Sequence, residues 1–141
     1  MADFVLHPRL AADSIFMRDL ALCQLRLNNV KSVPWLVLVP RRADISEIHQ
    51  LGAADRALLI EEIAQASRAF VELYAPDKIN VGAIGNVVPQ LHIHVIARFK
   101  SDPLWPDPVW GRVAAEAYAA EAIATIRQKL NAIDFGANPQ T

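Results

Sequence analysis

Cysteine is almost missing from this sequence: Cys23 is the only one among 141 residues. An intramolecular disulfide and a zinc site of the multi-cysteine kind each need at least two cysteines, so both are excluded. Chains without disulfides are typical of reducing compartments. We therefore expect a cytoplasmic protein.

Long apolar runs and long runs of one charge are missing too. No apolar stretch approaches the roughly 20 residues that a membrane helix needs, and the N-terminal MADFVLHPRL has neither a basic lead nor a signal-length apolar segment. The formal net charge of -1 gives no broad basic surface for a nucleic-acid backbone, although it is compatible with a small phosphate-sized basic pocket. We expect no membrane segment, no export and no nucleic-acid partner.

Apolar residues, by contrast, are plentiful. They make up 53% of the chain, which is enough for one hydrophobic core in a single domain over residues 1–141. The sequence contains no internal repeat and no low-complexity tract, and a short polar tail at residues 136–141 follows the last apolar residues.

Four segments have the patterns of β-strands. Residues 20–27 alternate apolar and polar side chains, whereas residues 35–40 form a continuous apolar run that is typical of a strand buried on both faces. We expect these two segments to form an antiparallel hairpin with a long connection. Residues 79–85 and 89–98, joined through GNVVP, predict a second hairpin.

Helical patterns complete the fold. Residues 54–74 place apolar side chains every three or four positions and predict one long amphipathic helix, which Pro76 ends. Ser46 is a candidate cap for a short helical turn before it. Three prolines and two tryptophans make residues 101–111 a stiff aromatic loop, and an alanine-rich helix follows at about residues 112–131. This order predicts an α+β domain, with an antiparallel sheet of about five strands backed by the long helix.

The stretch QLHIH places polar side chains at alternate positions of the last predicted strand. Alternation sends Gln90, His92 and His94 to one face of the strand, while their apolar neighbours face the other. Residues two apart on one face have Cβ atoms about 6.5–7 Å apart, so the two imidazoles can converge on one small group. Two partly buried histidines bonded to the backbone are the structural alternative. His7 and His49 are assigned no role.

Two kinds of chemistry suit this pair of histidines. His-x-His on a strand can supply two metal ligands, but the sequence nearby offers no carboxylate or cysteine as a third, and Gln90 is a poor zinc ligand. Alternatively, a neutral imidazole whose other nitrogen is held by a hydrogen bond is a good nucleophile near neutral pH, which suits transfer to phosphorus. We predict no metal.

The histidines and their surroundings resemble the histidine triad (HIT) superfamily of nucleotide hydrolases and transferases. GNVVPQLHIHVIAR is similar to its His-x-His-x-His signature, LNNVKSVPWLVLVPRR to its upstream hairpin, and INVGAIGN to its Asn-x-Gly segment. The likeness covers about residues 10–111. It implies a HIT-like fold, a homodimer, a purine nucleotide or similar substrate, and a mechanism without metal or cofactor.

The resemblance also implies roles for individual residues. His92 matches the histidine that attacks the α-phosphorus, and His94 matches the histidine that binds phosphate and assists the leaving group. Asn28 matches an asparagine that contacts ribose, and Asn86 matches a glutamine that contacts phosphate. Leu27 and nearby apolar residues would line the base pocket.

Three positions depart from the family pattern. Gln90 stands at the first histidine, so the motif is a Gln-x-His-x-His variant. Val87 stands where many members have a phosphate-facing hydroxyl, and Trp35 stands where one branch has a histidine. The leading hypothesis is an enzyme that acts at the α-phosphate of a nucleoside phosphoramidate, dinucleoside polyphosphate or related ester through a covalent nucleotidyl-histidine. The alternative is a weakly active or inactive protein that binds or senses a nucleotide.

Overall fold

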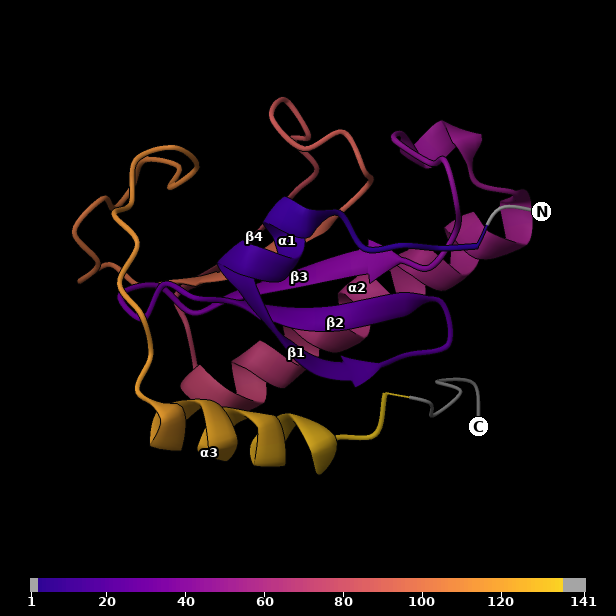
Figure 1. The fold of residues 1–141 in the computed structure, drawn as a ribbon. Coiled ribbons are helices and arrows are strands. Elements are labelled where there is room, and N and C mark those ends of the chain that lie inside the picture. Colours follow the sequence, from indigo (N-terminus) through magenta and orange to yellow (C-terminus); the bar gives the residue numbers. More distant parts are fainter. Residues whose placement is uncertain (1–2, 136–141) are drawn as a thin grey trace.

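The protein is a five-stranded antiparallel sheet with helices around it, as seen in a computed structural model that describes residues 3–135 (Figure 1). The strand order across the sheet is β1-β2-β3-β5-β4. The elements follow the chain as α1 (Pro8–Asp13), β1 (Ser14–Asp19), β2 (Cys23–Asn28), β3 (Trp35–Pro40), a 3-10 turn (Ile48–Gln50), α2 (Ala53–Tyr74), β4 (Lys78–Gly82), β5 (Ile93–Arg98) and α3 (Ala120–Asn131). The predicted α+β class is confirmed. The polar tail at 136–141 lies outside the described residues.

Strands β3 and β5 are neighbours in the interior of the sheet, and other parts of the chain cover both of their faces. All six residues of β3 are buried, as the continuous apolar run predicted. One sheet face packs on α2 through side chains such as Leu59, Ala66 and Phe70, which recur at helical spacing. The α2 helix ends where Ala75 takes a left-handed conformation before Pro76. The two predicted hairpins are confirmed as the antiparallel pairs β2–β3 and β4–β5.

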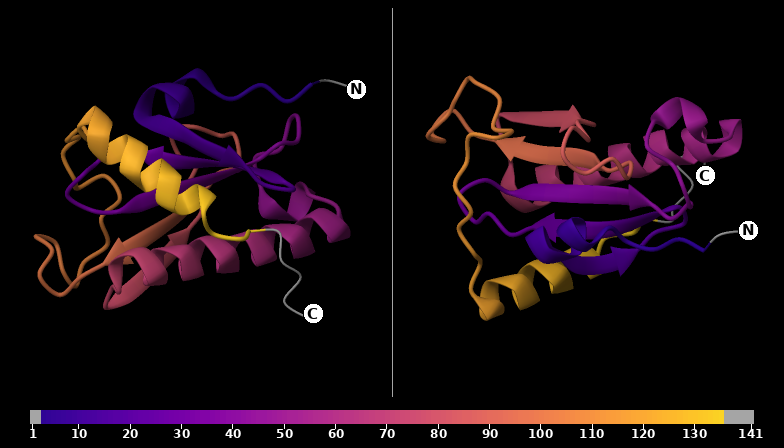
Figure 2. Two further views of the ribbon diagram at one scale, coloured as in Figure 1. Left: turned by 90° about the horizontal axis from the view of Figure 1, so that it is seen from below. Right: turned by 45° about the horizontal axis from the view of Figure 1, so that its top comes forward.

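The opposite face of the sheet carries a smaller apolar cluster. It is covered by the N-terminal segment with α1, which lies on the side away from α2 (Figure 2), and by the loop after β5. Helix α3 runs along the β1 edge of the sheet (Figure 1), where Arg127 bonds the Phe16 carbonyl at 3.0 Å. No helix in the described part of the chain is long and apolar enough to cross a membrane.

Several boundaries differ from the sequence prediction. The helix expected from residue 112 begins only at Ala120. Residues 112–119 instead run beside the β2–β3 connection, where Lys31 N–H donates to the Glu116 carbonyl at 2.8 Å and Tyr118 N–H donates to Oδ1 of Asn29 at 2.9 Å. These tertiary hydrogen bonds override the helix propensity of the alanines. The strand expected from residue 89 begins at Ile93.

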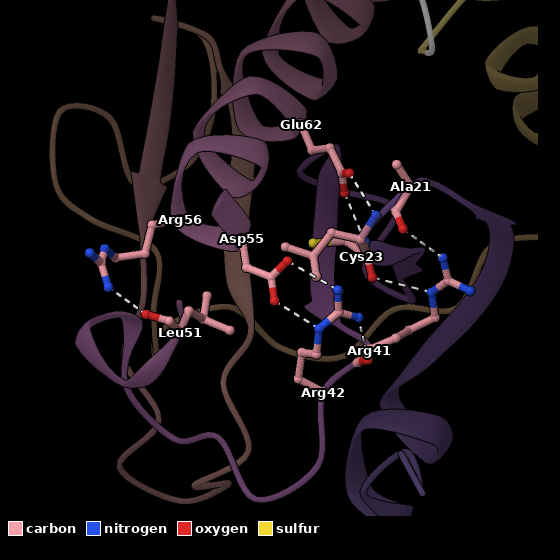
Figure 3. Close-up of polar contacts among 9 residues, drawn as sticks. Ala21, Cys23, Arg41, Arg42, Leu51, Asp55, Arg56 and Glu62 are labelled. Atoms are coloured by element: carbon pink, nitrogen blue, oxygen red, sulfur yellow. Dashed lines mark hydrogen bonds and ion pairs between the residues drawn. The ribbon is translucent and has the colours of Figure 1, made fainter. Parts of the chain in front are cut away.

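A buried carboxylate ties α2 to the sheet. Glu62 accepts hydrogen bonds at 2.8 Å from the backbone N–H groups of Leu22 and Cys23, at the turn that leads into β2 (Figure 3). Nearby, Arg42 forms a two-pronged ion pair with Asp55 near the start of α2 (Figure 3). The helix is therefore held against the sheet by polar contacts in its N-terminal half and by apolar packing along its length.

Candidate functional site

The two histidines lie side by side on the sheet face opposite α2. His94 belongs to β5, and His92 comes just before the strand begins at Ile93. Because Ile93 and Val95 face the α2 core, alternation sends His94 to the other face. The two rings lie edge to face with centroids 4.9 Å apart. The convergence that the sequence predicted for this pair is therefore present.

The ring of His92 is oriented by its own backbone neighbourhood. Its Nδ1 lies 2.7 Å from the backbone carbonyl oxygen of Gln90. A carbonyl can only accept a hydrogen bond, so Nδ1 carries the proton. In the neutral ring, Nε2 then holds the free lone pair, and His92 lines the pocket described below.

His94 has the opposite arrangement of its ring nitrogens. The indole Nε1–H of Trp35, on the neighbouring strand β3, donates a 2.8 Å hydrogen bond to Nδ1 of His94. Since an indole N–H can only donate, Nδ1 is unprotonated, and the proton of the neutral ring lies on Nε2. Burial, together with the nearby His92 ring, lowers the pKa of His94 to about 4. His94 is therefore a neutral N–H donor near pH 7.

A second tryptophan closes the other side of His94. Trp110, from the loop after β5, lies edge to face with His94 at 5.9 Å and with Trp35 at 6.4 Å between centroids. Gly82, which pairs with His94 across β4 and β5, leaves room for this indole. A Cβ at Gly82 would lie 3.1 Å from two atoms of the Trp110 ring.

The Gln90 side chain points to the N-terminal segment, which covers the same sheet face as the two histidines. Gln90 lies outside β5, and its side-chain amide is bonded to the N-terminal segment: Nε2 donates to the Val5 carbonyl, and Oε1 accepts from His7 N–H, both at 2.8 Å. The side chain thus fastens residues before α1, while the backbone carbonyl holds His92.

The histidines open into a pocket of about 250 Å³. His92, His94 and Trp110 form one wall, and residues 84–88 from the β4–β5 connection form another. Asn28 at the end of β2 lines the pocket, as do Asn86 and Val87, which are exposed at its rim. Three of the predicted nucleotide-binding residues therefore surround one cavity.

Leu27 is the exception, and its predicted place in a base pocket is wrong. Its side chain is fully buried in the core that packs on α2. Strand alternation explains the error, because Asn28 faces the pocket and its neighbour must face the other side of the sheet. Moving by one residue along a strand moves the side chain from the pocket face of the sheet to the core face.

The remaining wall of the pocket was not predicted. Arg9, Leu10 and Asp13 of α1 and Ser14 of β1 line the cavity. These residues lie in two elements that the sequence analysis did not identify. Pro8 at the first turn of α1, preceded by His7, whose Nδ1 accepts from Arg9 N–H, was the available helix-start signal.

The arrangement offers two histidines for chemistry. Among residues 3–135, no group of three or more His, Cys, Asp or Glu side chains is placed to hold a metal ion. Nε2 of His92 can act as a nucleophile, and Nε2–H of His94 can donate to an anionic oxygen.

Comparison with known proteins identifies similar folds and sequences. The family model described as the HIT domain matches residues 9–101. A histidine triad protein from Sinorhizobium meliloti 1021 is 44% identical, with 93% of this chain and 97% of that one covered and a TM-score of 0.90. A histidine triad protein from Bradyrhizobium japonicum is 41% identical, with coverages of 94% and 98% and a TM-score of 0.91.

Two further solved structures extend this comparison. One from Marinobacter aquaeolei VT8, a histidine triad protein, is 42% identical, with coverages of 94% and 96% and a TM-score of 0.91. A hypothetical histidine triad nucleotide-binding protein from Sulfolobus tokodaii strain7 is 14% identical over 84% of this chain and 82% of that one, with a TM-score of 0.58, and shares the fold alone. No curated protein sequence matches the chain.

Proposed function

Because the chain belongs to the HIT family, we propose that it is a nucleotide hydrolase or nucleotidyltransferase in which His92 attacks the α-phosphate. The substrate is a purine nucleotide or a similar compound: a nucleoside phosphoramidate, a dinucleoside polyphosphate or a related ester. The observation that carries this proposal is the hydrogen bond from Nδ1 of His92 to the Gln90 carbonyl, which leaves the lone pair of Nε2 for the pocket.

The reaction runs in two displacements. Nε2 of His92 forms a bond to the α-phosphorus, and the bond from phosphorus to the leaving group breaks, so that the leaving group departs with the electron pair. The ring then carries a positive charge, which the hydrogen bond from Nδ1–H to the Gln90 carbonyl stabilises. Water, or a second acceptor, attacks the phosphorus and releases His92 with its lone pair restored.

The other lining residues are proposed to hold the nucleotide. Asn28 and Asn86 both line the pocket, and in this proposal the Asn28 amide bonds ribose hydroxyls while the Asn86 amide donates to phosphate oxygens. Val87 is 69% exposed and adds no hydroxyl donor to that rim. Nε2–H of His94 donates to a phosphate oxygen or to the departing group.

The proposed activity is tested by turnover. Adenosine phosphoramidate, a dinucleoside polyphosphate and a fluorogenic adenylate are incubated with the protein and with His92→Ala. We expect release of nucleoside monophosphate by the parent and a loss of at least 10³-fold in His92→Ala, because the nucleophile is removed. His49→Ala, in the 3-10 turn and not among the residues that line the pocket, is the matched control and keeps the parent rate. Equal rates in the parent and His92→Ala would refute the assignment.

A nucleotide sensor is the second candidate. It is favoured by the Gln90 side chain, which is occupied by the N-terminal segment and supplies no titratable group to the pocket. Isothermal titration calorimetry separates the two functions. Nucleotide binding that survives His92→Ala, in a protein without turnover, would support the sensor and contradict the enzyme.

We also propose a homodimer in the cytoplasm. Within residues 3–135, strand β4 is an edge of the sheet that pairs only with β5, and its Val81 side chain is 47% exposed. Apolar edge strands favour pairing with another copy. Sedimentation of the parent should give the mass of two chains, and the mass of Val81→Lys should be closer to that of one chain. A parent with the mass of a single chain would contradict the dimer. The proposed location is supported by the cysteine content, since Cys23 is the only cysteine in the sequence.

A further inference from the structure

We propose that Trp35 is a positioning residue that fixes His94 as a neutral N–H donor, and that the site therefore selects nucleotides whose leaving group departs as an anion without receiving a proton from the protein. The inference rests on the proposed function and narrows its substrate class. Phosphate, polyphosphate and aryl oxide leaving groups fit it, whereas amines and alkyl alkoxides do not.

The hydrogen bond between the two rings permits only one arrangement of protons. Trp35 is buried, and its Nε1 lies 2.8 Å from Nδ1 of His94. An indole N–H can donate a hydrogen bond but cannot accept one. A proton on Nδ1 would set two N–H groups against each other at that distance. Forming the imidazolium would therefore break this bond and leave the buried indole N–H without a partner.

The surroundings of His94 reinforce the neutral state. The other titratable side chains that line the pocket within residues 3–135 are His92, Arg9 and Asp13. Asp13, the only carboxylate among them, faces Arg9 at 3.6 Å in an ion pair. Trp35 and Trp110 cover His94 with aromatic surface. Burial, followed by the neighbouring His92, lowers the pKa of His94 to about 4, in agreement with the geometry.

A neutral imidazole has a defined chemical capacity. Its Nε2–H can donate a hydrogen bond to charge that develops on a phosphate or leaving-group oxygen, but it is too weak an acid to transfer that proton near pH 7. When Nε2 of His92 bonds to the phosphorus, the leaving oxygen takes the electron pair of the broken bond as an anion. An amine or alkoxide needs a proton at that moment, and His94 cannot supply one.

A series of leaving groups tests the substrate class. The probes are aryl esters of adenosine 5′-monophosphate with phenols of graded acidity, one alkyl ester, one amine phosphoramidate and a dinucleoside polyphosphate. We expect kcat/KM to fall steeply as the leaving group becomes more basic, and the alkyl ester and phosphoramidate to react at least 10²-fold more slowly than the dinucleoside polyphosphate, in line with the usual size of general-acid catalysis. Rates that do not depend on the leaving group, or a phosphoramidate as fast as the polyphosphate, would overturn the inference.

A variant pair tests the positioning role without relying on turnover. Trp35→Phe keeps a ring and removes the N–H, and ¹⁵N NMR of the ring nitrogens should show His94 changing from the single Nε2–H form to a mixture of tautomers, with kcat reduced more than KM is changed. Trp110→Phe is the matched control, because it removes the other indole beside His94, whose Nε1 has no hydrogen-bond partner within residues 3–135. It should preserve the Nε2–H form. An unchanged His94 tautomer in Trp35→Phe would overturn the positioning role.

The failure of this inference differs from failure of the proposed function. If no substrate is turned over and His92 is never nucleotidylated, the proposed function fails, and the substrate class fails with it. If turnover occurs at His92 but is insensitive to the leaving group, the proposed function stands and only the substrate class is overturned.

Discussion

The backbone carbonyl of Gln90 lies 2.7 Å from Nδ1 of His92. The residue at the first position of the Gln-x-His-x-His motif thus orients the proposed nucleophile through its main chain, which every residue type shares. Its side chain does a separate task, since both polar atoms of the amide bond the N-terminal segment. A glutamine at this position is therefore compatible with an oriented nucleophile.

Replacing Gln90 with alanine separates these two tasks. The carbonyl is retained, so we expect kcat of Gln90→Ala to fall by less than about tenfold, whereas His92→Ala loses the nucleophile. The two lost side-chain bonds, one of them exposed, should cost about 1–2 kcal/mol of unfolding free energy. Hydrogen exchange at the His7 amide should accelerate. A rate as low as that of His92→Ala would contradict a main-chain role.

Gly82 controls the place of Trp110 beside His94. In Gly82→Ala, the added Cβ would lie 3.1 Å from the indole, so the ring must shift by a few tenths of an ångström beside His94. We expect an increased KM and a shifted tryptophan emission spectrum. Gly52→Ala is the control, because a Cβ there meets nothing within 4 Å, and it should leave both properties unchanged. Unchanged kinetics and emission in Gly82→Ala would show that the contact does not matter.

The buried ion pair of Arg98 with Asp102 holds the loop that carries Trp110. The two side chains are only 1% and 5% exposed and lie 2.8 Å apart. Asp102→Ala leaves the Arg98 charge uncompensated, and we expect a loss of about 3–5 kcal/mol in denaturant unfolding. Asp107→Ala removes the partner of the exposed Arg112 and should cost at most about 1 kcal/mol. Similar costs for the two variants would contradict this difference.

The same pair predicts the direction of the acid dependence. Hydrogen bonds from Arg98 lower the pKa of Asp102 below its ordinary value of 3.8. The ionised carboxylate therefore stabilises the fold at every pH above its ordinary pKa. This contribution to stability is lost as the pH falls through the lowered pKa of the folded state. The unfolding free energy should therefore be measured across the acid range. Its fall with pH should include a contribution in the parent that is missing from Asp102→Ala.

Glu62 provides a test of the contact between α2 and the sheet. Glu62→Gln keeps one acceptor oxygen but turns an NH₂ group toward one of the two backbone N–H donors. We expect a loss of about 1–3 kcal/mol in unfolding free energy, because a buried donor loses its partner. Glu72→Gln, at an exposed position of the same helix, is the control and should change stability little. Equal stability of both variants would show that Glu62 is dispensable.

Periodic segments of the sequence predicted much of the fold. The long helix was expected from residue 54 and begins at Ala53, and the run at β3 is buried throughout as expected. Strand β1 was not identified because its register shifts between Phe16 and Arg18, which breaks the alternation. A helix was predicted at 112–119 from its alanines, but tertiary hydrogen bonds hold this segment in a non-helical conformation.

The histidine pair was predictable because both residues lie in or next to one strand. The opposite wall of the pocket, with Arg9 and Asp13, comes from a distant segment, and no local pattern connects it with His92. The hydrogen bond from Trp35 to His94 joins positions 59 residues apart. The sequence around Trp35 and the sequence around His94 could not predict this bond, since pairing across strands depends on the register between them.

The central claim is that His92 becomes covalently nucleotidylated, and a trapping experiment tests it most directly. The protein is mixed with excess substrate, quenched in denaturing alkali, which preserves phosphorus–nitrogen bonds, and digested for mass spectrometry. We expect a mass increase of one nucleoside monophosphate on the peptide that contains His92, and none in His92→Ala. Turnover with no adduct on this peptide, or an adduct that persists in His92→Ala, would contradict the account.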